Sequence, residues 1–173
     1  MAKLSIITAP DPRLKVVSEP VAEVDYGIQK LMDDMLSTMY AAPGIGLAAV
    51  QVGVPKRVIV MDTGEQGGQD KPLCMVNPEV LTASDDMWTY EEGCLSLPDQ
   101  YADVRRPVAV TLNFLDYEGE PQELEAKGLL ATCIQHELDH LEGILFVDHL
   151  STLRRGIILK KLRKAKRESA AAE

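Results

Sequence analysis

The organisation of this chain follows from residues 128–143, GLLATCIQHELDHLEG. Apolar residues recur there at helical spacing and a glycine stands at each end, so the segment predicts a helix from about Leu129 to Glu142. One face of this helix is apolar, as in a helix that packs on a core. The residues of that face are Leu130, Ile134, Leu138 and Leu141. We therefore expect the helix to lie at the centre of the fold.

Within this helix, His136, Glu137 and His140 form the pattern HExxH. Two histidines four residues apart lie about 40° apart around a helix axis, so both imidazoles can reach one metal ion. The adjacent Glu137 can then accept a proton from a water molecule that the ion activates. Histidines that only satisfy hydrogen bonds in a core would not explain so many polar side chains between apolar turns. The pattern predicts a metal-dependent hydrolase.

An open catalytic metal site needs a third protein ligand besides the two histidines. The zinc-peptidase pattern HExxHxxGxxH is excluded, because Phe146 stands where its third histidine would be. His149 lies beyond that spacing, and we expect it at the surface or beside a ligand. Cys133 is next to His136 on the helix, and its short side chain does not easily bend to the same ion. Cys94 is the better candidate, because the glycine and proline around it indicate irregular backbone that can present a thiolate.

The rest of the chain predicts strands grouped between helices. An N-terminal helix is expected over about Val24 to Ala41, and a final helix is expected to begin near Ser151 as its N-cap. Glu65 to Lys71 is expected to form an exposed loop. The predicted strands cover residues 57–62, 73–76, 80–89, 104–116 and 122–126. Without regular alternation of strand and helix, this pattern predicts an α+β fold: short, mainly antiparallel strands around a central HExxH-bearing helix, with N-terminal and C-terminal helices.

Composition indicates an ordinary globular protein. The chain has 173 residues, a hydrophobic share of 46%, and no apolar run near the roughly 20 residues that a membrane-spanning helix needs. The first residues do not resemble a secretory leader, and three cysteines are an odd number, so we expect a cytoplasmic protein with reduced thiols and no membrane partner. A catalytic metallohydrolase domain over residues 1–150 and a basic helix and tail over 151–173 are expected to form one domain unit.

The net charge of −9 is unevenly distributed. Residues 154–173 carry eight Lys/Arg and two Glu, a balance of +6, whereas the other residues carry ten basic and 25 acidic side chains, a balance of −15. The acidic body argues against a nucleic-acid groove across the domain, and no DNA partner is expected. The basic tail could contact phosphate or an acidic surface.

Three segments together resemble the motifs of the peptide deformylases. They are GIGLAAVQ at residues 44–51, EGCLS at residues 92–96 and QHELDH at residues 135–140. Each alone would be weaker, since a glycine-rich loop indicates only close backbone approach and EGCLS could be a turn with a buried thiol. The three occur in order and at sensible separations. The resemblance implies hydrolysis of the formyl group from the N-terminal formylmethionine of newly synthesised proteins, with release of formate.

The resemblance also implies the roles of particular residues. The metal ligands would be Cys94, His136 and His140, with Fe(II) as the native ion and Zn(II), Ni(II) or Co(II) as substitutes. Glu137 would transfer the proton from water to the leaving amine. The Gln51 side-chain amide and the Leu95 backbone N–H would stabilise the developing oxyanion. These residues would form the catalytic centre.

For substrate binding, the resemblance implies an extended peptide beside the backbone of Gly46. Its methionine would enter an apolar pocket that includes Ile45, Leu129 and Cys133. Helical geometry puts Leu129 and Cys133 on the side of His136, although periodicity alone leaves a simple core role equally open. The tail resembles the basic C-terminal helix by which bacterial members of the family dock at the ribosome.

Two alternatives remain open on the sequence. Another HExxH metallopeptidase, acting on internal amide bonds, would usually have His or Glu as third ligand, so Cys94 argues against it. A non-enzymatic, ribosome-associated module would hold a structural metal with four protein ligands, and water on the ion would exclude it.

Overall fold

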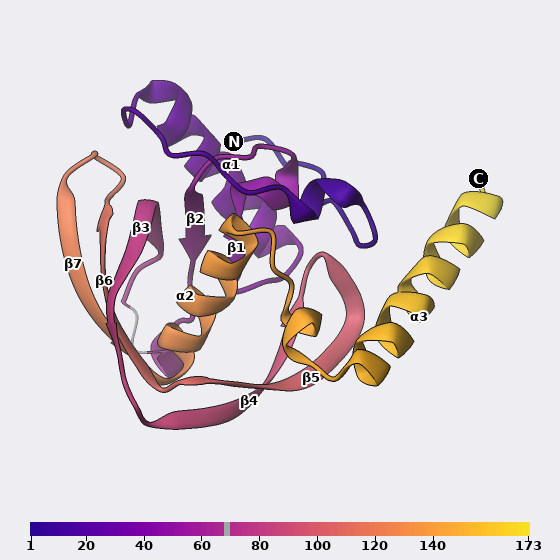
Figure 1. The fold of residues 1–173 in the computed structure, drawn as a ribbon. Helices are drawn as coiled ribbons and strands as arrows, with labels where there is room; N and C mark the ends of the chain where they lie inside the picture. The colour runs from indigo at the N-terminus through magenta and orange to yellow at the C-terminus, as the bar shows by residue number, and fades with distance from the viewer. Residues whose placement is uncertain (68–69) are drawn as a thin grey trace.

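The computed structural model describes residues 1–67 and 70–173. Within these residues it has three α-helices, seven strands and short 3-10 turns (Figure 1). In chain order the helices and strands are α1 (Tyr26–Ala41), β1 (Gly46–Ala48), β2 (Val58–Met61), β3 (Leu73–Ala83), β4 (Met87–Cys94), β5 (Leu97–Pro107), β6 (Ala109–Leu115), β7 (Pro121–Lys127), α2 (Gly128–Leu141) and α3 (Thr152–Ala171). The α+β fold class predicted from the sequence is confirmed.

The strands form two antiparallel sheets. The larger sheet has the order β1-β2-β3-β6-β7, and the smaller one is the hairpin of β4 and β5. The helix α2 contacts strands of both sheets, and Figure 1 shows it enclosed between the strands on either side. The HExxH-bearing helix is therefore central, as the sequence predicted.

The apolar face of α2 is packed against the larger sheet. Leu130, Ile134 and Leu141 are buried in one cluster with side chains from β2, β3 and β6. The helix follows β7 without an intervening loop, because Gly128 adopts a φ of +60° in the left-handed region that favours glycine. Burial of one face thus fixes which residues of α2 point toward the smaller sheet.

The N-terminal helix α1 begins two residues later than the sequence predicted. Asp25 is its N-cap, and the Asp25 side chain accepts a hydrogen bond from the backbone N–H of Ile28 at 2.9 Å. Its buried methionines pack on β1 and β2. They are Met32, Met35 and Met39.

The strand boundaries differ from the predicted ones at two prolines. In place of the predicted strands at 73–76 and 80–89, the structure has β3 and β4. β3 continues past Pro78 through a register shift between Val76 and Glu79. A shift of this kind accommodates a residue that cannot donate to the ladder. The predicted strand at 104–116 is divided after Pro107 into β5 and β6, which belong to different sheets. β3 has 11 residues and is longer than expected, whereas β5, also of 11 residues, begins at Leu97, before the predicted start at residue 104.

The predicted loop at Glu65 to Lys71 is described only in part. Glu65–Gly67 forms a short 3-10 turn, and residues 68–69 lie outside the described residues.

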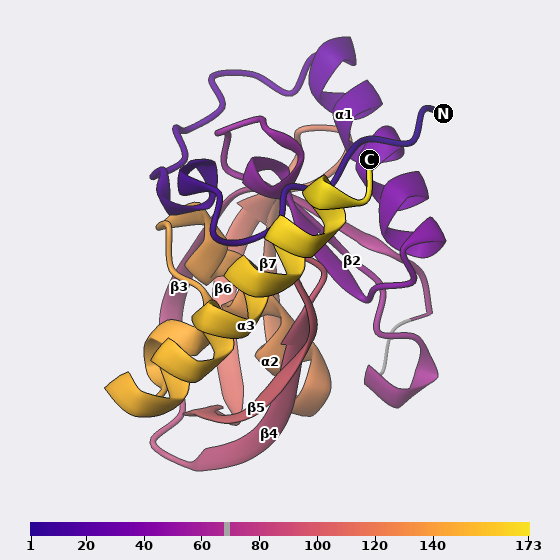
Figure 2. The ribbon, with the colours of Figure 1, turned by 90° about the vertical axis from the view of Figure 1, so that its right-hand side faces the viewer.

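The C-terminal helix α3 begins after Ser151, whose side chain accepts a hydrogen bond from the backbone N–H of Arg154 at 3.3 Å. Ile158 and Leu162 are buried in a cluster with residues of β5 and of the turn at Phe146–His149. Figure 1 shows the end of α3 extending away from the body, and Figure 2 shows the helix crossing in front of the sheets. Among the described residues, no helix has both the length and the apolar composition needed to cross a bilayer.

Candidate active site

The polar face of α2 borders a cavity of about 720 Å³. Its walls come mainly from three parts of the chain that are distant in sequence: residues 42–46 before and within β1, the turn end of the β4–β5 hairpin, and α2. Ile6 and Gln51 complete the lining. All three segments that resemble family motifs therefore meet at this cavity.

Cys94, His136 and His140 form a group that could hold a metal ion, with one ligand atom from each lying within 4.8 Å of the others. The Cys94 Sγ is 3.3 Å from the His140 Nε2. Both histidines are buried one turn apart on α2, whereas Cys94 is the last residue of β4. A register shift between Gly93 and Cys94 interrupts the β4–β5 ladder at this point, which is the irregular backbone expected around the thiol.

The orientation of His136 is set by Glu92. The His136 Nδ1 is 2.8 Å from the Glu92 Oε1, and because a carboxylate only accepts, Nδ1 must donate, which leaves Nε2 as the nitrogen that can hold an ion once it has lost its proton. Arg106 in turn donates to both oxygens of Glu92, at 2.7 Å from Nε and 3.0 Å from Nη2. Burial alone would raise the pKa of Glu92, but the hydrogen bonds from His136 and Arg106 outweigh it and lower the pKa to about 2. Glu92 is thus a permanent anion behind His136.

The electrostatics of the group favour a positive charge beside Cys94. Burial acts to lower the pKa of His136, yet its hydrogen bonds with Cys94 and Glu92 raise that pKa well above the usual value. The pKa of His140 is instead lowered well below its usual value by burial and by the charge of His136. Without an ion, His136 therefore favours its protonated form, and a metal ion would take the place of that proton. A thiolate with two imidazoles is a donor set that transition metals accept.

Glu137 lies against the backbone of β1. A Cβ added to Gly46 would be 2.5 Å from the Glu137 Oε1, so the space that glycine leaves is filled by the carboxylate. The other oxygen, Oε2, is buried and has no hydrogen-bond partner in the part of the chain that the structure describes. Burial raises the pKa of Glu137 to about 7. A carboxyl group with a pKa near neutrality can both accept and return a proton.

Gln51 is held rigidly at the cavity and is only 1% exposed. Its Oε1 accepts a hydrogen bond from the Ala48 backbone N–H at 2.9 Å, which fixes the direction of the amide. Its Nε2 donates to the Ser96 hydroxyl at 2.9 Å and lies 3.6 Å from the Cys94 Sγ. Leu95, which follows Cys94, also borders the cavity. The two residues expected to contact an oxyanion are therefore both next to Cys94 in space or in sequence.

The residues expected to bind the substrate, Gly46 beside its backbone and the others around its methionine, border the same cavity. They are Ile45, Gly46, Leu129 and Cys133. The Cys133 thiol donates to the Ile45 carbonyl at 3.6 Å, and burial raises the pKa of this thiol well above its usual value, so it remains neutral. This part of the wall is uncharged.

The structure also adds residues that sequence reasoning missed. Tyr90 and Thr132 border the cavity, and Arg106 and Glu92 form the ion pair behind His136. A signal for Arg106 existed, because Ala102, Val104 and Arg106 alternate along β5 and all three are buried. An arginine among the inward-facing residues of a strand indicates a buried anionic partner.

A buried HExxH helix that borders a cavity, with a cysteine from a neighbouring strand, defines a metal-dependent hydrolase. A model of the polypeptide deformylase family matches residues 3–156. The chain belongs to the polypeptide deformylase family. The resemblance and the enzyme class expected from the sequence are thereby confirmed, and neither the other metallopeptidases nor a non-enzymatic module is favoured.

Individual relatives agree with the family match. A peptide deformylase from Phenylobacterium zucineum is 59% identical over 164 residues, covering 95% of this chain and 97% of the relative. The solved structure of a peptide deformylase from Ehrlichia chaffeensis in complex with actinonin has a TM-score of 0.93 and 44% identity, covering 96% of this chain and 99% of the other. A class I type b peptide deformylase from Acinetobacter baumannii, solved with Met-Ala-Ser bound, has a TM-score of 0.83 and 36% identity, covering 86% and 99%.

Proposed function

We propose that this chain hydrolyses the formyl group from the N-terminal formylmethionine of newly synthesised proteins, releasing formate. The observation that carries the proposal is Glu137, a buried carboxyl group with a pKa of about 7 and one unpartnered oxygen among the described residues, beside the Cys94, His136 and His140 group. Family membership supports the substrate class. The Acinetobacter relative with bound Met-Ala-Ser supports a peptide that begins with methionine.

We assign Cys94, His136 and His140 as the residues that would hold the ion. Fe(II) is the ion that the family resemblance implies, and Zn(II), Ni(II) or Co(II) would suit the same donors. When bound, the ion supplies Lewis-acid activation of the formyl carbonyl and of the attacking water. Glu92 supports this assignment, because it keeps the His136 Nε2 lone pair available on the side away from the carboxylate.

Glu137 would move the proton. It accepts a proton from water as the water oxygen bonds to the formyl carbon, and it returns the proton to the methionine nitrogen as the C–N bond breaks. The products are formate and a peptide with a free amino terminus. The Gln51 amide and the Leu95 backbone N–H would donate to the formyl oxygen as negative charge develops on it. Because Gln51 is already fixed by Ala48 and Ser96, its amide needs little reorganisation to do so.

The position of β1 supports an extended substrate. β1 is the edge strand of the larger sheet, since in the described part of the chain it pairs with β2 alone, and its first residue, Gly46, borders the cavity. An extended peptide can add to such an edge through backbone hydrogen bonds. The methionine side chain would then meet the uncharged wall of Ile45, Leu129 and Cys133.

The test is formate release from formyl-Met-Ala-Ser by protein purified without oxygen. Formyl-Asp-Ala-Ser is the matched substrate for the side chain. Acetyl-Met-Ala-Ser is the matched substrate for the acyl group, and its hydrolysis is followed by the free amino terminus because it cannot release formate. Glu137→Gln is the matched variant with the ligand set intact. We expect hydrolysis of formyl-Met-Ala-Ser only. In Glu137→Gln, kcat should fall by several orders of magnitude while the metal content is unchanged. Equal kcat/KM for the Met and Asp peptides would contradict the pocket, and cleavage of the Met–Ala bond would indicate another peptidase.

We also propose that α3 docks on the ribosome, which would place the reaction in the cytoplasm. Ile158 and Leu162 anchor the helix, while most of its basic side chains are exposed. Because these anchors belong to the core cluster of β5, deleting the helix would disturb the body, and charge substitution is the better test. Replacing Lys160, Lys161, Lys164 and Lys166 by glutamine should weaken ribosome binding and reduce its salt dependence, with turnover of the short peptide retained. Unchanged affinity would refute this docking.

A further inference from the structure

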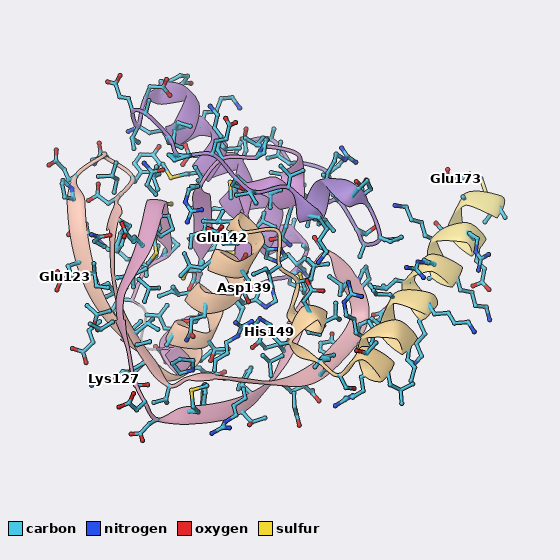
Figure 3. The ribbon with its side chains drawn as sticks, viewed as in Figure 1. Glu123, Lys127, Asp139, Glu142, His149 and Glu173 are labelled. Atoms are coloured by element: carbon cyan, nitrogen blue, oxygen red, sulfur yellow. The ribbon has the colours of Figure 1, made fainter. Side chains whose placement is uncertain are left out.

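His149 is the histidine that the proposed reaction does not use. It ends the turn Phe146–His149, and its side chain is 36% exposed. Its Nε2 lies 2.7 Å from the Asp139 Oδ2, and because a carboxylate only accepts, the Nε2 carries the proton. Figure 3 labels Asp139 on α2 and His149 on the turn beside it. A surface histidine is thus tied to the helix that carries the metal group.

This contact continues inward as an unbroken series of hydrogen bonds. The Arg106 Nη1 donates to the same Asp139 Oδ2 at 2.9 Å. Arg106 also holds both oxygens of Glu92, and Glu92 holds the His136 Nδ1 at 2.8 Å. Four contacts therefore connect the surface imidazole of His149 with the candidate ligand His136.

The interior of this series is buried and charged, which makes its geometry demanding. The side chains of Arg106 and Glu92 are almost fully buried, so each needs its partner in place. Asp139 is the outer support of Arg106, and its side chain is partly exposed. Two donors on one oxygen restrain the Asp139 carboxylate more than Arg106 does alone.

The turn itself does not need His149 to be held. Asp148 pairs with Lys15 and, at 2.8 Å, with Arg155, and it accepts from the Leu145 backbone N–H at 2.8 Å. These contacts come from the N-terminal segment, from α3 and from the turn. If His149 only helped to hold the turn, replacing it would therefore have little effect.

We propose that His149 is a positioning residue of the metal centre. It restrains Asp139, which supports Arg106 on Glu92 and so fixes the orientation of the His136 imidazole toward the ion. The inference rests on the proposed metal site. Replacing a group that directly supports a metal ligand typically changes metal affinity or activity about 10- to 100-fold, so a support three residues further away should change it by about 2- to 5-fold.

The test measures the metal rather than turnover. Co(II)-loaded protein gives a visible spectrum that reports ligand geometry, and transfer of cobalt to a chelator gives its dissociation rate. His149→Phe keeps the ring volume and removes the donor, whereas His149→Gln retains an N–H donor. Glu142→Gln is the control, because it removes the 2.6 Å ion pair with Arg57 at the end of the same helix and has no described contact with the series.

We expect His149→Phe to release cobalt about 2- to 5-fold faster, with an altered visible spectrum. His149→Gln should restore the wild-type rate, and Glu142→Gln should leave it unchanged. In an Asp139→Ala background, His149→Phe should add no further change, because its effect passes through the Asp139 carboxylate.

Several results would overturn the inference. They are a wild-type rate and spectrum in His149→Phe, an equal effect of Glu142→Gln, an additive effect in the Asp139→Ala background, or wild-type protein that binds no cobalt. If His149→Phe does not fold, His149→Ala takes its place with the same expected outcomes. Formate release on the same samples separates the two proposals: altered cobalt release without any deformylation would refute the proposed function alone.

Discussion

Substituting Gly46 by alanine should reveal how closely the backbone of β1 approaches the proposed base. The new Cβ would be 2.5 Å from the Glu137 Oε1 and 2.9 Å from the Cys133 Sγ. Ordinary contact begins at 3.4 Å, so the carboxylate must retreat by about 0.9 Å. Added volume in a packed site costs about 1–3 kcal/mol of stability, and a misplacement of about 1 Å at a catalytic group costs about 100-fold in rate.

Gly156→Ala is the matched control for this substitution. Gly156 is exposed within α3, and a Cβ there would meet no atom within 4 Å, so the change should stabilise the helix by about 0.5–1 kcal/mol. The assay is kcat and KM for formyl-Met-Ala-Ser, with metal content and the free energy of unfolding from urea titration. Gly46→Ala protein with full metal content and turnover within twofold of wild type would refute the reasoning, since the carboxylate would then not need its present position.

Three further substitutions test other parts of the structure. Cys94→Ser should weaken metal binding at least about tenfold by equilibrium dialysis, because a neutral hydroxyl is a poor replacement for a thiolate; undiminished affinity would remove Cys94 from the ligand set. Trp88→Phe removes the 2.8 Å hydrogen bond to the buried Thr132 hydroxyl and should lower the free energy of unfolding by about 1–3 kcal/mol in urea titration. An unchanged free energy of unfolding would contradict the role of Trp88 in docking β4 on α2. Gly143→Ala should lower stability by about 1–3 kcal/mol more than Gly64→Ala, since both have positive φ but only the Gly143 Cβ would clash with a backbone carbonyl; equal losses would show that the clash is relieved.

The parts of the fold that the sequence predicted are those set by local patterns. The three helices follow from apolar periodicity and caps, and the HExxH spacing alone puts His136 and His140 on one face of α2. The division of residues 104–116 into two strands was missed, because apart from Arg106 the alternate positions on both sides of Pro107 are apolar in the same phase. Only the pairing partners distinguish the two strands: β5 pairs with β4, whereas β6 pairs with β3 and β7.

The support behind the site could be predicted only in part, because the alternation along β5 puts Arg106 on the inward face but does not give its partners. Glu92, Arg106 and Asp139 are far apart in sequence, and a charged residue in a strand usually faces solvent. Their contact depends on how the β4–β5 hairpin packs against α2, which no local pattern encodes. His149 could be placed near the surface or beside a ligand from its spacing, but its contact with Asp139 required the path of the turn after α2.

The candidate ligands belong to two pieces of the molecule that do not share a sheet. Cys94 lies at the turn of the β4–β5 hairpin, whereas the histidines belong to the helix packed on the larger sheet, and Cys94 and His140 are 46 positions apart in the chain. An ion bound by all three would act as an inorganic cross-link that closes this long loop. By the chain-entropy relation used for disulfides, such a closure is worth about 4 kcal/mol. Metal-free protein should then be cut by proteases within the hairpin sooner than metal-loaded protein, so that a cell short of the metal would lose the enzyme itself as well as its activity.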